Sequence, residues 1–565
     1  MPTKSELANF LNARDLLLRY RTDYLQAYQH FSWPSLQYFN WASDYFDRLA
    51  RNNSNTALWI VNEDGTERRF TFEEMSRRSS QTAAFLLKHG VRPGTRILMM
   101  LPNTVAIWEI MLAAMKIGAV LVPVSTLLTA EELRDRVLRS SVTHIVTDME
   151  RSSRFADIGG AQTRIMAEGT MTGWIDYTEA YDEQPAALSG EAAIPINSPY
   201  LLYFTSGTTS QPKLVVHSRE SYPVGHLATM YWIGLQPGDL HMNISSPGWA
   251  KHAWSSFFAP WNAGATIFVY NYNRFDPKKT LDTIARYGVS TLCAPPTVWR
   301  ILIQQPLASY SVSLREIVSA GEPLNPEVIA QVRSAWGITI RDGYGQTETV
   351  ATIGNCPGQT VQEGFMGKPT PGHKILLVAV DGREGQEGEI CLSRDSKPHS
   401  LMTGYLTGQL DDEQSAGSGL YRTGDIARKD EGGCFNYIGR VDDVFKSSDY
   451  RISPFELESV LLECPLVAEA AVVPSRDAKR GDVPKAFLLL APGAEASRAN
   501  AREIFRFIRS RIAPFKRIRR IEFRDLPKTI SGKIRRAELR RIEATGEITS
   551  RAANEFCEED FPELQ

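Results

Sequence analysis

A repeated alternation of helical and strand-like segments constrains the fold of this chain more than any other feature. From about Phe70 onward, helical stretches such as 71–88 and 105–117 alternate with short apolar or β-branched runs, and Gly or Pro breaks separate them. The expected strands are 96–101, 119–123, 144–147, 265–270, 290–294 and 315–319. This alternation predicts an α/β fold in which helices cover parallel sheets and ligands bind at the carboxyl ends of the strands.

Length and composition are those of an ordinary globular protein. The 565 residues suffice for two to four domains, and 43% hydrophobic content with a net charge of -2 gives no indication of a nucleic-acid partner. The six cysteines lack CxxC spacing, which argues against a zinc site or a disulfide framework and favours a reducing compartment, by default the cytoplasm. The segment 1–21 lacks a signal-peptide core and is expected to form a surface helix, and no window reaches the ~20 apolar residues that a membrane span needs.

A hydroxyl-rich loop lies between the apolar runs 200–204 and 214–216, so a strand, a turn and a second strand are expected there. Its polar residues are Thr205, Ser206, Gly207, Thr208, Thr209, Ser210 and Lys213. Such a loop offers N–H and O–H donors and a positive charge to a polyphosphate. Pro212 replaces the second glycine of a Walker P-loop. On its own, a solvated Ser/Thr loop is an equally good interpretation.

Five short motifs follow this loop in the chain. They are AGEPL at 320–324, GYGQTE at 343–348, YRTGD at 421–425, GRVDD at 439–443 and PKTISGK at 527–533. Each alone is typical of a turn, a solvated loop or a hairpin tip. Their joint occurrence in this order is far more specific.

With these motifs, residues 38–541 resemble the adenylate-forming superfamily, which includes acyl-CoA synthetases, non-ribosomal peptide adenylation domains and luciferases. The sequence is most similar to the short- and medium-chain acyl-CoA synthetases. This closer resemblance rests on CAPPT at 293–297, AGEPLNPEV at 320–328, GQTETV at 345–350 and TISGKIRR at 529–536.

The resemblance implies a division into two domains. Residues 1–441 are expected to form a large AMP-binding domain of two βα sheets plus a distorted β-barrel, and residues 442–545 a small mobile α+β domain with its hinge at Asp442. A local excess of 15 Lys and Arg over 4 Asp and Glu in 502–541 supports a boundary, although a solvated basic face explains it equally well. The acidic tail, 546–565, is expected to be flexible.

The resemblance also implies an ATP-dependent ligase that activates a carboxylic acid as acyl-AMP and transfers it to CoA. Substrates and cofactors would be ATP, Mg²⁺, CoA and a small-molecule acid, in fatty acid metabolism, with the protein a monomer or homo-oligomer. Glu348 would bind Mg²⁺, Thr347 the α-phosphate, and Lys533 the reacting oxygens as charge builds. The other expected nucleotide contacts are Thr205, Ser206, Gly207, Thr208, Thr209, Lys213, Gly321, Glu322, Pro323, Gly343, Tyr344, Gly345, Gln346, Asp425 and Arg440.

The resemblance assigns two further sets of residues. Ser447, Ser448, Arg451 and Lys516 are expected to contact CoA. Trp249, His252, Trp254, Cys293 and Val350 are expected to line the acyl pocket. Bulky tryptophans shorten a pocket and favour a short, branched or small aromatic acid, although core packing explains Trp249 and Trp254 equally well. An ionised carboxylate needs no base, so His252 is interpreted as a wall residue.

Two residues depart from the family pattern. Ser210 replaces a glycine of the phosphate loop, and Asp449 replaces a glycine in a stretch that borders the thiol tunnel. A carboxylate there is expected to hinder an anionic cofactor. Two alternatives therefore stay open: a ligase that delivers the acyl group to a carrier protein or another acceptor, and a catalytically silent nucleotide-binding homologue.

Overall fold

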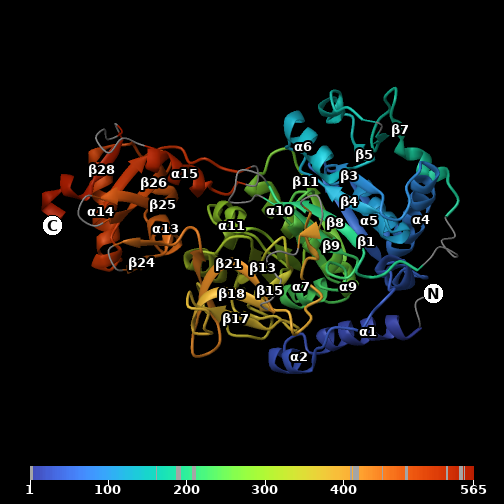
Figure 1. Cartoon of the computed structure of the whole chain (residues 1–565), viewed down its shortest axis with the longest axis horizontal. Helices are drawn as coiled ribbons and strands as arrows, with labels where there is room; N and C mark the ends of the chain where they lie inside the picture. The colour runs from blue at the N-terminus through green and yellow to red at the C-terminus, as the bar shows by residue number, and fades with distance from the viewer. Residues whose placement is uncertain are drawn as a thin grey trace. The chain divides into compact units, whose positions relative to one another are not determined.

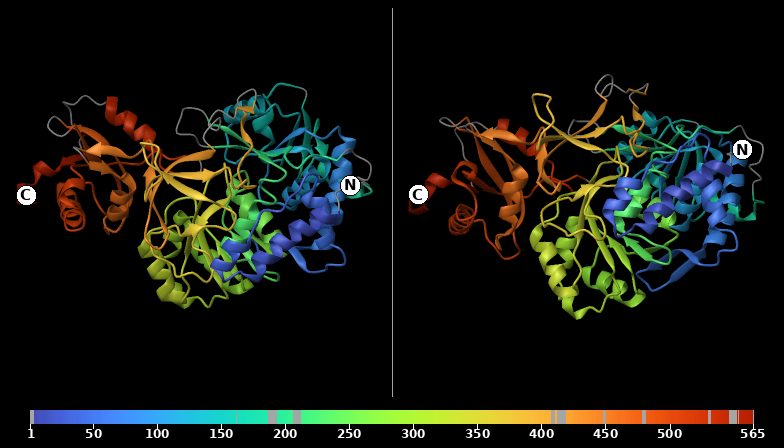
Figure 2. Two further views of the ribbon diagram at one scale, coloured as in Figure 1. Left: turned by 60° about the horizontal axis from the view of Figure 1, so that its bottom comes forward. Right: turned by 90° about the horizontal axis from the view of Figure 1, so that it is seen from below.

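The structure is a computed structural model. It describes residues 4–564 except 161, 186–192, 206–211, 407–409, 412–418, 448–449, 478–480, 530–531, 546–551 and 553. The chain divides into two compact units, one formed by Met1–Lys374 and Ser393–Tyr421, the other by Ile375–Leu392 and Arg422–Gln565. Figures 1 and 2 show the elements of each unit, with the amino-terminal helices in blue and the last domain in orange to red.

The first sheet of the large unit has six parallel strands at its centre. Its order is β16 (Lys368–Pro369), β15 (Ala351–Gly354), β14 (Arg341–Gly345), β13 (Glu316–Ala320), β12 (Thr291–Cys293), β10 (Leu240–Asn243), β11 (Thr266–Asn271), β1 (Thr56–Asn62), β2 (Glu67–Thr71). Strands β14, β13, β12, β10, β11 and β1 run parallel, and β15 and β16 at one edge and β2 at the other extend the sheet antiparallel. The carboxyl ends of the six parallel strands therefore meet at one edge.

The second sheet carries the hydroxyl-rich loop. Its order is β20 (Leu410–Asp411), β19 (Gly404–Leu406), β9 (Leu214–Ser218), β8 (Pro199–Phe204), β4 (Val120–Pro123), β3 (Arg96–Met100), β5 (His144–Thr147), β6 (Thr163–Met166), β7 (Ile175–Asp176). Strands β8 and β9 pair antiparallel on either side of the loop, which confirms the two expected strands. Strand β8 runs parallel to β4 and β3, so the loop lies at their carboxyl ends.

Helices cover both sheets, as the alternation predicts. The large unit contains α1 (Lys4–Arg19), α2 (Tyr24–His30), α3 (Asp47–Leu49), α4 (Phe72–Lys88), α5 (Val105–Ile117), α6 (Ala130–Ser140), α7 (His226–Ile233), α8 (Ala250–Ala253), α9 (Ala259–Ala263), α10 (Pro277–Tyr287), α11 (Pro296–Leu302) and α12 (Pro326–Trp336). Helix α6 packs on one face of the second sheet, and α4 and α5 pack on the other (Figure 1). Every residue of α5 is buried, because this helix lies in the hydrophobic core that contains residues of both sheets.

Local sequence explains where these helices begin. Thr71 and Glu74 form a capping box at α4, and Thr129 and Glu132 form one at α6. Each box satisfies backbone N–H groups that have no partner within the helix. These reciprocal hydrogen bonds fix the first turn of each helix against its sheet.

The small unit contains two sheets and a short ribbon. One sheet has the order β17 (Ile375–Val378), β18 (Glu387–Ser393), β21 (Leu420–Lys429), β22 (Phe435–Arg440), and the other β25 (Val467–Asp477), β26 (Gly481–Leu490), β27 (Arg520–Phe523), β28 (Glu555–Cys557). The ribbon pairs β23 (Phe445–Ser447) with β24 (Tyr450–Ile452), and the helices are α13 (Pro454–Leu462), α14 (Arg498–Arg509) and α15 (Arg536–Thr545). The α/β class is confirmed. In the described residues, however, the strands β17, β18, β21 and β22 form an open four-stranded sheet and not a closed barrel.

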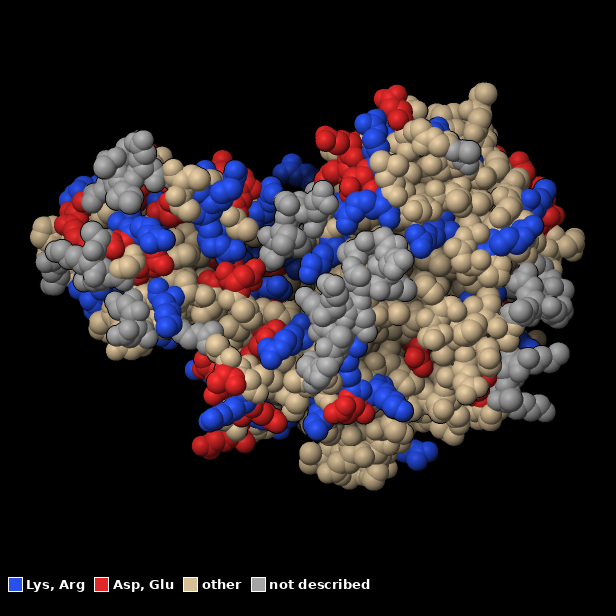
Figure 3. All heavy atoms as spheres, in the orientation of Figure 1, with Lys and Arg blue, Asp and Glu red and all other residues tan. Residues whose placement is uncertain are grey.

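The acidic tail differs from the expected flexible segment. Residues Glu555–Cys557 form β28, which pairs antiparallel with β27, and Phe561 is 1% exposed in the core of this unit. Buried Glu558 binds Arg509 at 2.5 Å and also contacts Arg519. Acidic and basic side chains are interspersed over this unit (Figure 3). The acidic tail is thus held by basic side chains of the segment 502–541. The sequence does not show which of these charges pair, because the partners are far apart along the chain.

Candidate active site

Four of the segments expected around the nucleotide and the acid lie at the carboxyl edge of the first sheet. Strand β10 leads to the segment before Trp249, β12 ends at Cys293, β13 leads to Gly321, and β14 ends at Gly345. These strands are parallel neighbours, so their ends are adjacent. The topology therefore collects four motifs that are far apart in the sequence, which is the arrangement typical of ligand sites in α/β proteins.

The hydroxyl-rich loop is closed at its base. The Thr205 backbone N–H donates to the Lys213 carbonyl oxygen at 2.9 Å, one step beyond the last β8–β9 pair. Ser206, Gly207, Thr208, Thr209 and Ser210 lie outside the described residues. Of the expected phosphate-binding residues in this loop, the structure thus places Thr205 and Lys213.

Tyr405 of β19 joins Lys213 to Glu348. The Tyr405 hydroxyl donates to Glu348 Oε1 at 2.9 Å, and Lys213 Nζ lies 4.7 Å from the centre of the Tyr405 ring. The Met402 backbone N–H also donates to the Glu348 carbonyl oxygen at 2.8 Å. The structure therefore brings together the lysine of the first motif and the carboxylate of GYGQTE, which are 135 positions apart in the sequence.

Two buried side chains fix the backbone of Thr347. His217 Nε2 lies 2.6 Å from the Thr347 carbonyl oxygen, and the Tyr222 hydroxyl donates to the same oxygen at 3.4 Å. Since a carbonyl only accepts, His217 Nε2 carries the proton and Nδ1 accepts from the Ser221 hydroxyl at 2.9 Å. Burial lowers the pKa of His217 to about 3, so the ring is neutral at physiological pH. This network orients the Thr347 backbone without adding a charge.

Trp254 forms a wall beside the GYGQTE turn. Its indole Nε1 donates to the Tyr222 hydroxyl at 3.1 Å. A Cβ on Gly345 would lie 2.8 Å from Trp254 Cη2 and 2.1 Å from the Val350 carbonyl oxygen, so only glycine allows this close approach. Trp254 is thus packed directly against the turn that leads to Thr347 and Glu348.

The other expected acyl-site residues have different surroundings. His252 is buried, its Nε2 lies 2.8 Å from Asn103 Oδ1, and burial lowers its pKa to about 3. The low pKa makes the ring a weak base, and with its hydrogen bond to Asn103 this agrees with a wall residue. Cys293 and Val350 are fully buried, whereas Trp249 is half-buried at the start of α8.

The AGEPL turn lies beside β14. Gly321 has a φ of +111°, a conformation that other residues rarely adopt, and it lets the chain turn at the end of β13. Below the turn, Asp342 is buried and accepts backbone N–H groups from Gly343 and Leu324. Burial raises the pKa of Asp342 to about 7, and those hydrogen bonds oppose the shift. Asp342 thus ties the AGEPL and GYGQTE turns together.

In the small unit, Asp425 and Arg440 occupy paired positions of β21 and β22. Arg440 Nη1 lies 3.6 Å from Asp425 Oδ1, and the Tyr437 hydroxyl donates to the same oxygen at 3.2 Å. Burial acts to lower the pKa of Arg440, but the charges of Asp425 and Asp442 outweigh it and raise that pKa above its ordinary value. The carboxylate of Asp425 is therefore held in a fixed direction by a permanently charged partner.

Lys533 lies at the tip of a hairpin. The Thr529 backbone N–H donates to the Lys533 carbonyl oxygen at 2.8 Å, and the Lys533 backbone N–H donates to the Thr529 hydroxyl at 3.1 Å. These bonds fix the backbone while the lysine side chain stays exposed.

The expected CoA contacts also lie in the small unit. Lys516 Nζ is bound to both carboxylate oxygens of Glu456 at 2.7 Å, a partner that the sequence does not reveal. The exposed rings of Tyr450 and Phe515 stack with centres 4.4 Å apart beside it. Ser447 ends β23 and Arg451 belongs to β24, whereas Ser448 and Asp449 lie outside the described residues.

Sequence reasoning missed three residues that hold this site, Tyr405, His217 and Tyr222. His217 and Tyr222 follow the phosphate loop within ten positions of Lys213, so their proximity to a motif was a usable indication. Tyr405 lies in a segment without any motif, and only the pairing of β19 with β9 brings it to the loop. Of the described residues, no helix is both long and apolar enough to cross a membrane.

Comparison with known proteins agrees with this geometry. Residues 46–406 match the family of AMP-binding enzymes, and residues 456–533 match the AMP-binding enzyme C-terminal domain. The chain is 41% identical over 521 residues to 4-hydroxybutyrate–CoA ligase 1 of Metallosphaera sedula, covering 90% of this chain and 91% of the relative. It is 36% identical over 547 residues to the mitochondrial acyl-coenzyme A synthetase ACSM3 of Homo sapiens, covering 92% of each.

Solved structures show the same fold. An anthranilate CoA ligase, AuaEII, in complex with anthranoyl-AMP has a TM-score of 0.80 and 27% identity, covering 90% of this chain and 98% of that one. A benzoate CoA ligase from Burkholderia xenovorans LB400 has a TM-score of 0.76 and 27% identity, covering 89% and 100%. The chain therefore belongs to the AMP-binding, adenylate-forming enzymes and is an AMP-forming acid–thiol ligase of the acyl-CoA synthetase type.

Proposed function

We propose that this acyl-CoA synthetase activates a short- or medium-chain, branched or small aromatic carboxylic acid, in the setting of fatty acid metabolism. The acid attacks the α-phosphate of ATP, pyrophosphate leaves, and the acyl-AMP then passes its acyl group to the thiol of CoA with release of AMP. The observation that carries the proposal is the contact chain from Lys213 through Tyr405 to Glu348, next to the anchored Thr347. These groups provide the cation, the carboxylate and the hydroxyl that a triphosphate site requires.

The nucleotide roles follow from this arrangement. We assign Lys213, Thr205 and the loop residues Ser206 to Thr209 to the β- and γ-phosphates, and Thr347 to the α-phosphate. The turns that Asp342 joins would hold the adenine, with Tyr344 on one side and Gly321, Glu322 and Pro323 on the other. Gly343, Gly345 and Gln346 complete the turn, and Gln346 Oε1 accepts from the Tyr421 hydroxyl at 3.1 Å.

Asp425 is assigned to the ribose hydroxyls. Its carboxylate is an acceptor, and Arg440 and Tyr437 fix its direction, so two hydroxyl donors would find a preformed partner. Asp442 is assigned to the hinge, and its contact with Arg440 Nε at 3.4 Å would couple the ribose contact to that hinge.

The Glu348 carboxylate would hold a magnesium ion next to the phosphates. Tyr405 occupies only Oε1, and the described residues contain no group of three His, Cys, Asp or Glu that could hold a metal by themselves. Magnesium in phosphoryl sites is held by one or two carboxylates together with phosphate oxygens and water, so a single carboxylate suits it. When bound, the ion would neutralise the charge that develops on the phosphates. Glu348 would orient it, and Tyr405 would hold Glu348.

The nature of the acid is inferred from the wall beside Gly345. Trp254 fills the space next to the Gly345 turn, and His252 contributes a neutral ring. The acyl pocket is therefore expected to be short. Trp249, Cys293 and Val350 are assigned to the rest of its lining. The names of three relatives, which refer to 4-hydroxybutyrate, anthranilate and benzoate, support a small acid.

The acceptor is assigned as CoA. The exposed Tyr450–Phe515 stack offers an aromatic surface for a base, and Lys516, Ser447, Ser448 and Arg451 are assigned to the phosphates and pantetheine. Lys516 would exchange its Glu456 partner for a phosphate. We also propose the cytoplasm as location, supported by six free cysteines, although the ACSM3 relative is named mitochondrial.

One screen tests the proposed function. Carboxylate-dependent exchange of pyrophosphate into ATP is measured with linear, branched and aryl acids of two to ten carbons, and AMP release is then measured with and without CoA. Exchange with a short, branched or aryl acid, followed by CoA-dependent AMP release, is the expected result. Exchange without any CoA dependence would favour delivery to another acceptor, and no exchange with any acid would favour a silent homologue.

Tyr405→Phe is expected to raise the KM for MgATP by about 10-fold. The variant keeps the ring under Lys213 and removes only the hydroxyl that holds Glu348, and a hydrogen bond to a charged group contributes about 1.5–3 kcal/mol. Tyr421→Phe is the matched control, because its hydroxyl binds the neutral Gln346 amide and its loss should raise KM only about 3-fold. Initial-rate measurements at varied MgATP check both variants. An unchanged KM in Tyr405→Phe contradicts the assigned role.

A further inference from the structure

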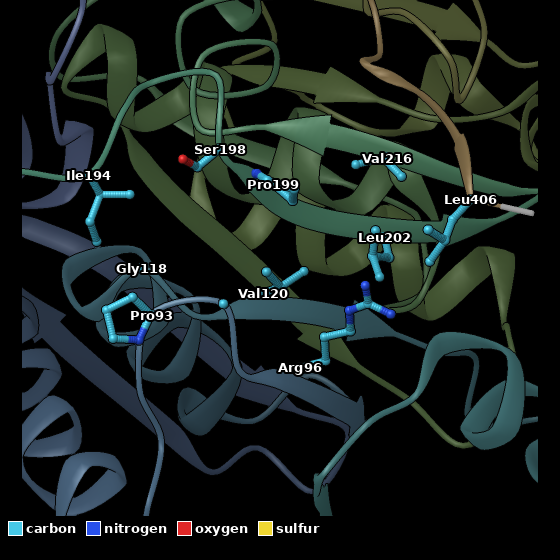
Figure 4. A pocket seen from close by; sticks show the side chains of 11 residues that line it. Pro93, Arg96, Gly118, Val120, Ile194, Ser198, Pro199, Leu202, Val216 and Leu406 are labelled. Carbon is cyan, nitrogen blue, oxygen red and sulfur yellow. The ribbon is translucent and has the colours of Figure 1, made fainter. Parts of the chain in front are cut away.

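A cavity lies on the second sheet at the end opposite to the phosphate loop. Its volume is about 340 Å³. Figure 4 shows the lining, which is largely apolar. The apolar lining side chains are Pro93, Val120, Ile194, Pro199, Leu202, Val216 and Leu406.

The strand directions place this cavity. Arg96, Val120 and Pro199 are the first residues of the parallel strands β3, β4 and β8, so the cavity lies at their amino ends. The phosphate loop follows Phe204 at the other end of β8. Six extended residues separate the two ends by roughly 17 Å. The lining also includes Leu202 and Leu406, which lie on the face of the sheet toward α6. Their neighbours Tyr203 and Tyr405 point to the opposite face, so the cavity and the Tyr405 side of the candidate active site lie on opposite faces of the sheet.

The face of the sheet explains the apolar lining. Val120, Leu202 and Val216 point to the face that packs against α6, as do Leu98 and Met100. Arg96 lies on the same face of β3 as Leu98 and Met100 and reaches the end of α6, where its Nη1 donates to the Ser140 carbonyl oxygen at 2.9 Å. At the rim, Pro93, Gly94 and Pro199 are exposed, so solutes can enter.

The charge of the lining is positive. Among the described residues, Arg96 is the one charged residue of the lining, and none of the described lining residues is acidic. Figure 4 shows its guanidinium among the apolar side chains. Only Nη1 has a hydrogen-bond partner among the described residues, so the remaining donors are open to an anion.

A second arginine lies behind one wall. Arg219 is 2% exposed, and its Nε and Nη1 have no hydrogen-bond partner in the described part of the chain. Its Nη1 lies 3.3 Å from the position that a Cβ on Gly118 would occupy, and Gly118 and Ile194 line the cavity. Burial lowers the pKa of Arg219 to about 10, which the nearby charge of Asp44 only partly offsets. A buried guanidinium with two unpaired donors is costly and favours a further anion nearby.

We propose that this cavity is a second ligand site, which binds an apolar monocarboxylate. The carboxylate would bind the Arg96 guanidinium, and the apolar body would lie against Val120, Leu202 and Leu406. Arg219 would contribute its positive charge from behind Gly118. Cavities of this size commonly hold small ligands when they are apolar with a few placed polar groups.

The test uses the full-length protein and octane-1-sulfonate, an apolar anion that cannot be adenylated. Binding is measured by isothermal titration calorimetry. We expect saturable binding that Arg96→Gln weakens by about 10-fold, the scale of one lost hydrogen bond to a charged group. Arg92→Gln is the matched control, because Arg92 also donates to backbone carbonyls but lies outside the cavity. This control should bind like the wild type, and 1-octanol, which lacks the charge, should bind about 10-fold more weakly.

Two results would overturn the proposal. One is the absence of binding up to about 1 mM probe. The other is equal affinity in the wild type and Arg96→Gln, which would place the probe elsewhere, for example at the acyl site. If Arg96→Gln does not fold, Ile194→Trp decides, because this half-buried residue lines the cavity and a larger ring there should block it. Unchanged affinity in Ile194→Trp would equally refute the site.

Discussion

Lys533→Ala is expected to slow acyl-adenylate formation by about 10²- to 10³-fold, the scale of one preorganised electrostatic contact in a transition state. Two anions, the carboxylate and the triphosphate, must approach each other in this step, and a lysine that contacts the reacting oxygens offsets their repulsion. The hydrogen bonds between Thr529 and Lys533 fix the backbone of the hairpin. The Lys533 side chain is exposed and therefore available to contact a ligand. Transfer of the acyl group from supplied acyl-adenylate to CoA should survive, because that step no longer involves the triphosphate.

Two separate assays check this expectation. Pyrophosphate exchange reports the first half-reaction, and thioester formation from synthetic acyl-adenylate reports the second. Lys528→Ala is the matched control, since Lys528 lies on the same hairpin but binds Glu469 at 2.6 Å. The control should retain both activities. Equal loss of both half-reactions in Lys533→Ala would show that the residue supports structure or CoA binding instead.

Glu348→Gln is expected to reduce pyrophosphate exchange by about 10²- to 10³-fold and to raise the Mg²⁺ concentration needed for half-maximal rate. Gln keeps the size of the side chain and an oxygen that accepts from Tyr405, but it removes the negative charge that a hard cation requires. The loss should therefore be larger than that of Tyr405→Phe, which only releases the carboxylate.

The control and the measurement for Glu348 follow the same logic. Glu327→Gln changes an exposed carboxylate of the same unit, at the start of α12, and should leave the rate unchanged. Exchange rates are measured over a range of Mg²⁺ at saturating ATP. If Glu348→Gln showed the wild-type rate and the wild-type Mg²⁺ dependence, the metal assignment would be wrong.

Several elements were predictable because their determinants are local. The helix 105–117 and the strand 144–147 have the predicted bounds, since each is an apolar segment between Gly or polar breaks. The capping box of Thr71 and Glu74 is likewise a local feature, because both of its residues lie within four consecutive positions. Motifs that follow strands were correctly expected at strand ends, because parallel strands place them at one edge.

Other features depend on contacts between distant segments. The expected barrel is an open sheet in the described residues, and β28 anchors a tail that its composition suggested to be flexible. Lys516 was expected to be available for a phosphate, yet Glu456 binds it. For both the tail and Lys516, the sequence shows that acidic and basic residues are present, but it does not show which of them pair.

The sequence by itself determined the α/β class, the order of the motifs and the chemistry that their side chains offer, because periodicity and residue type are local properties. Only the tertiary structure decided which side chains support that chemistry. Tyr405 contacts Glu348 and His217 contacts Thr347 because sheet pairing and helix packing bring separate segments within hydrogen-bond distance. The cavity at Arg96 arises in the same way, since three strands that are distant in sequence begin side by side. Hydrogen bonds and cavities depend on positions in space, and no linear pattern specifies them.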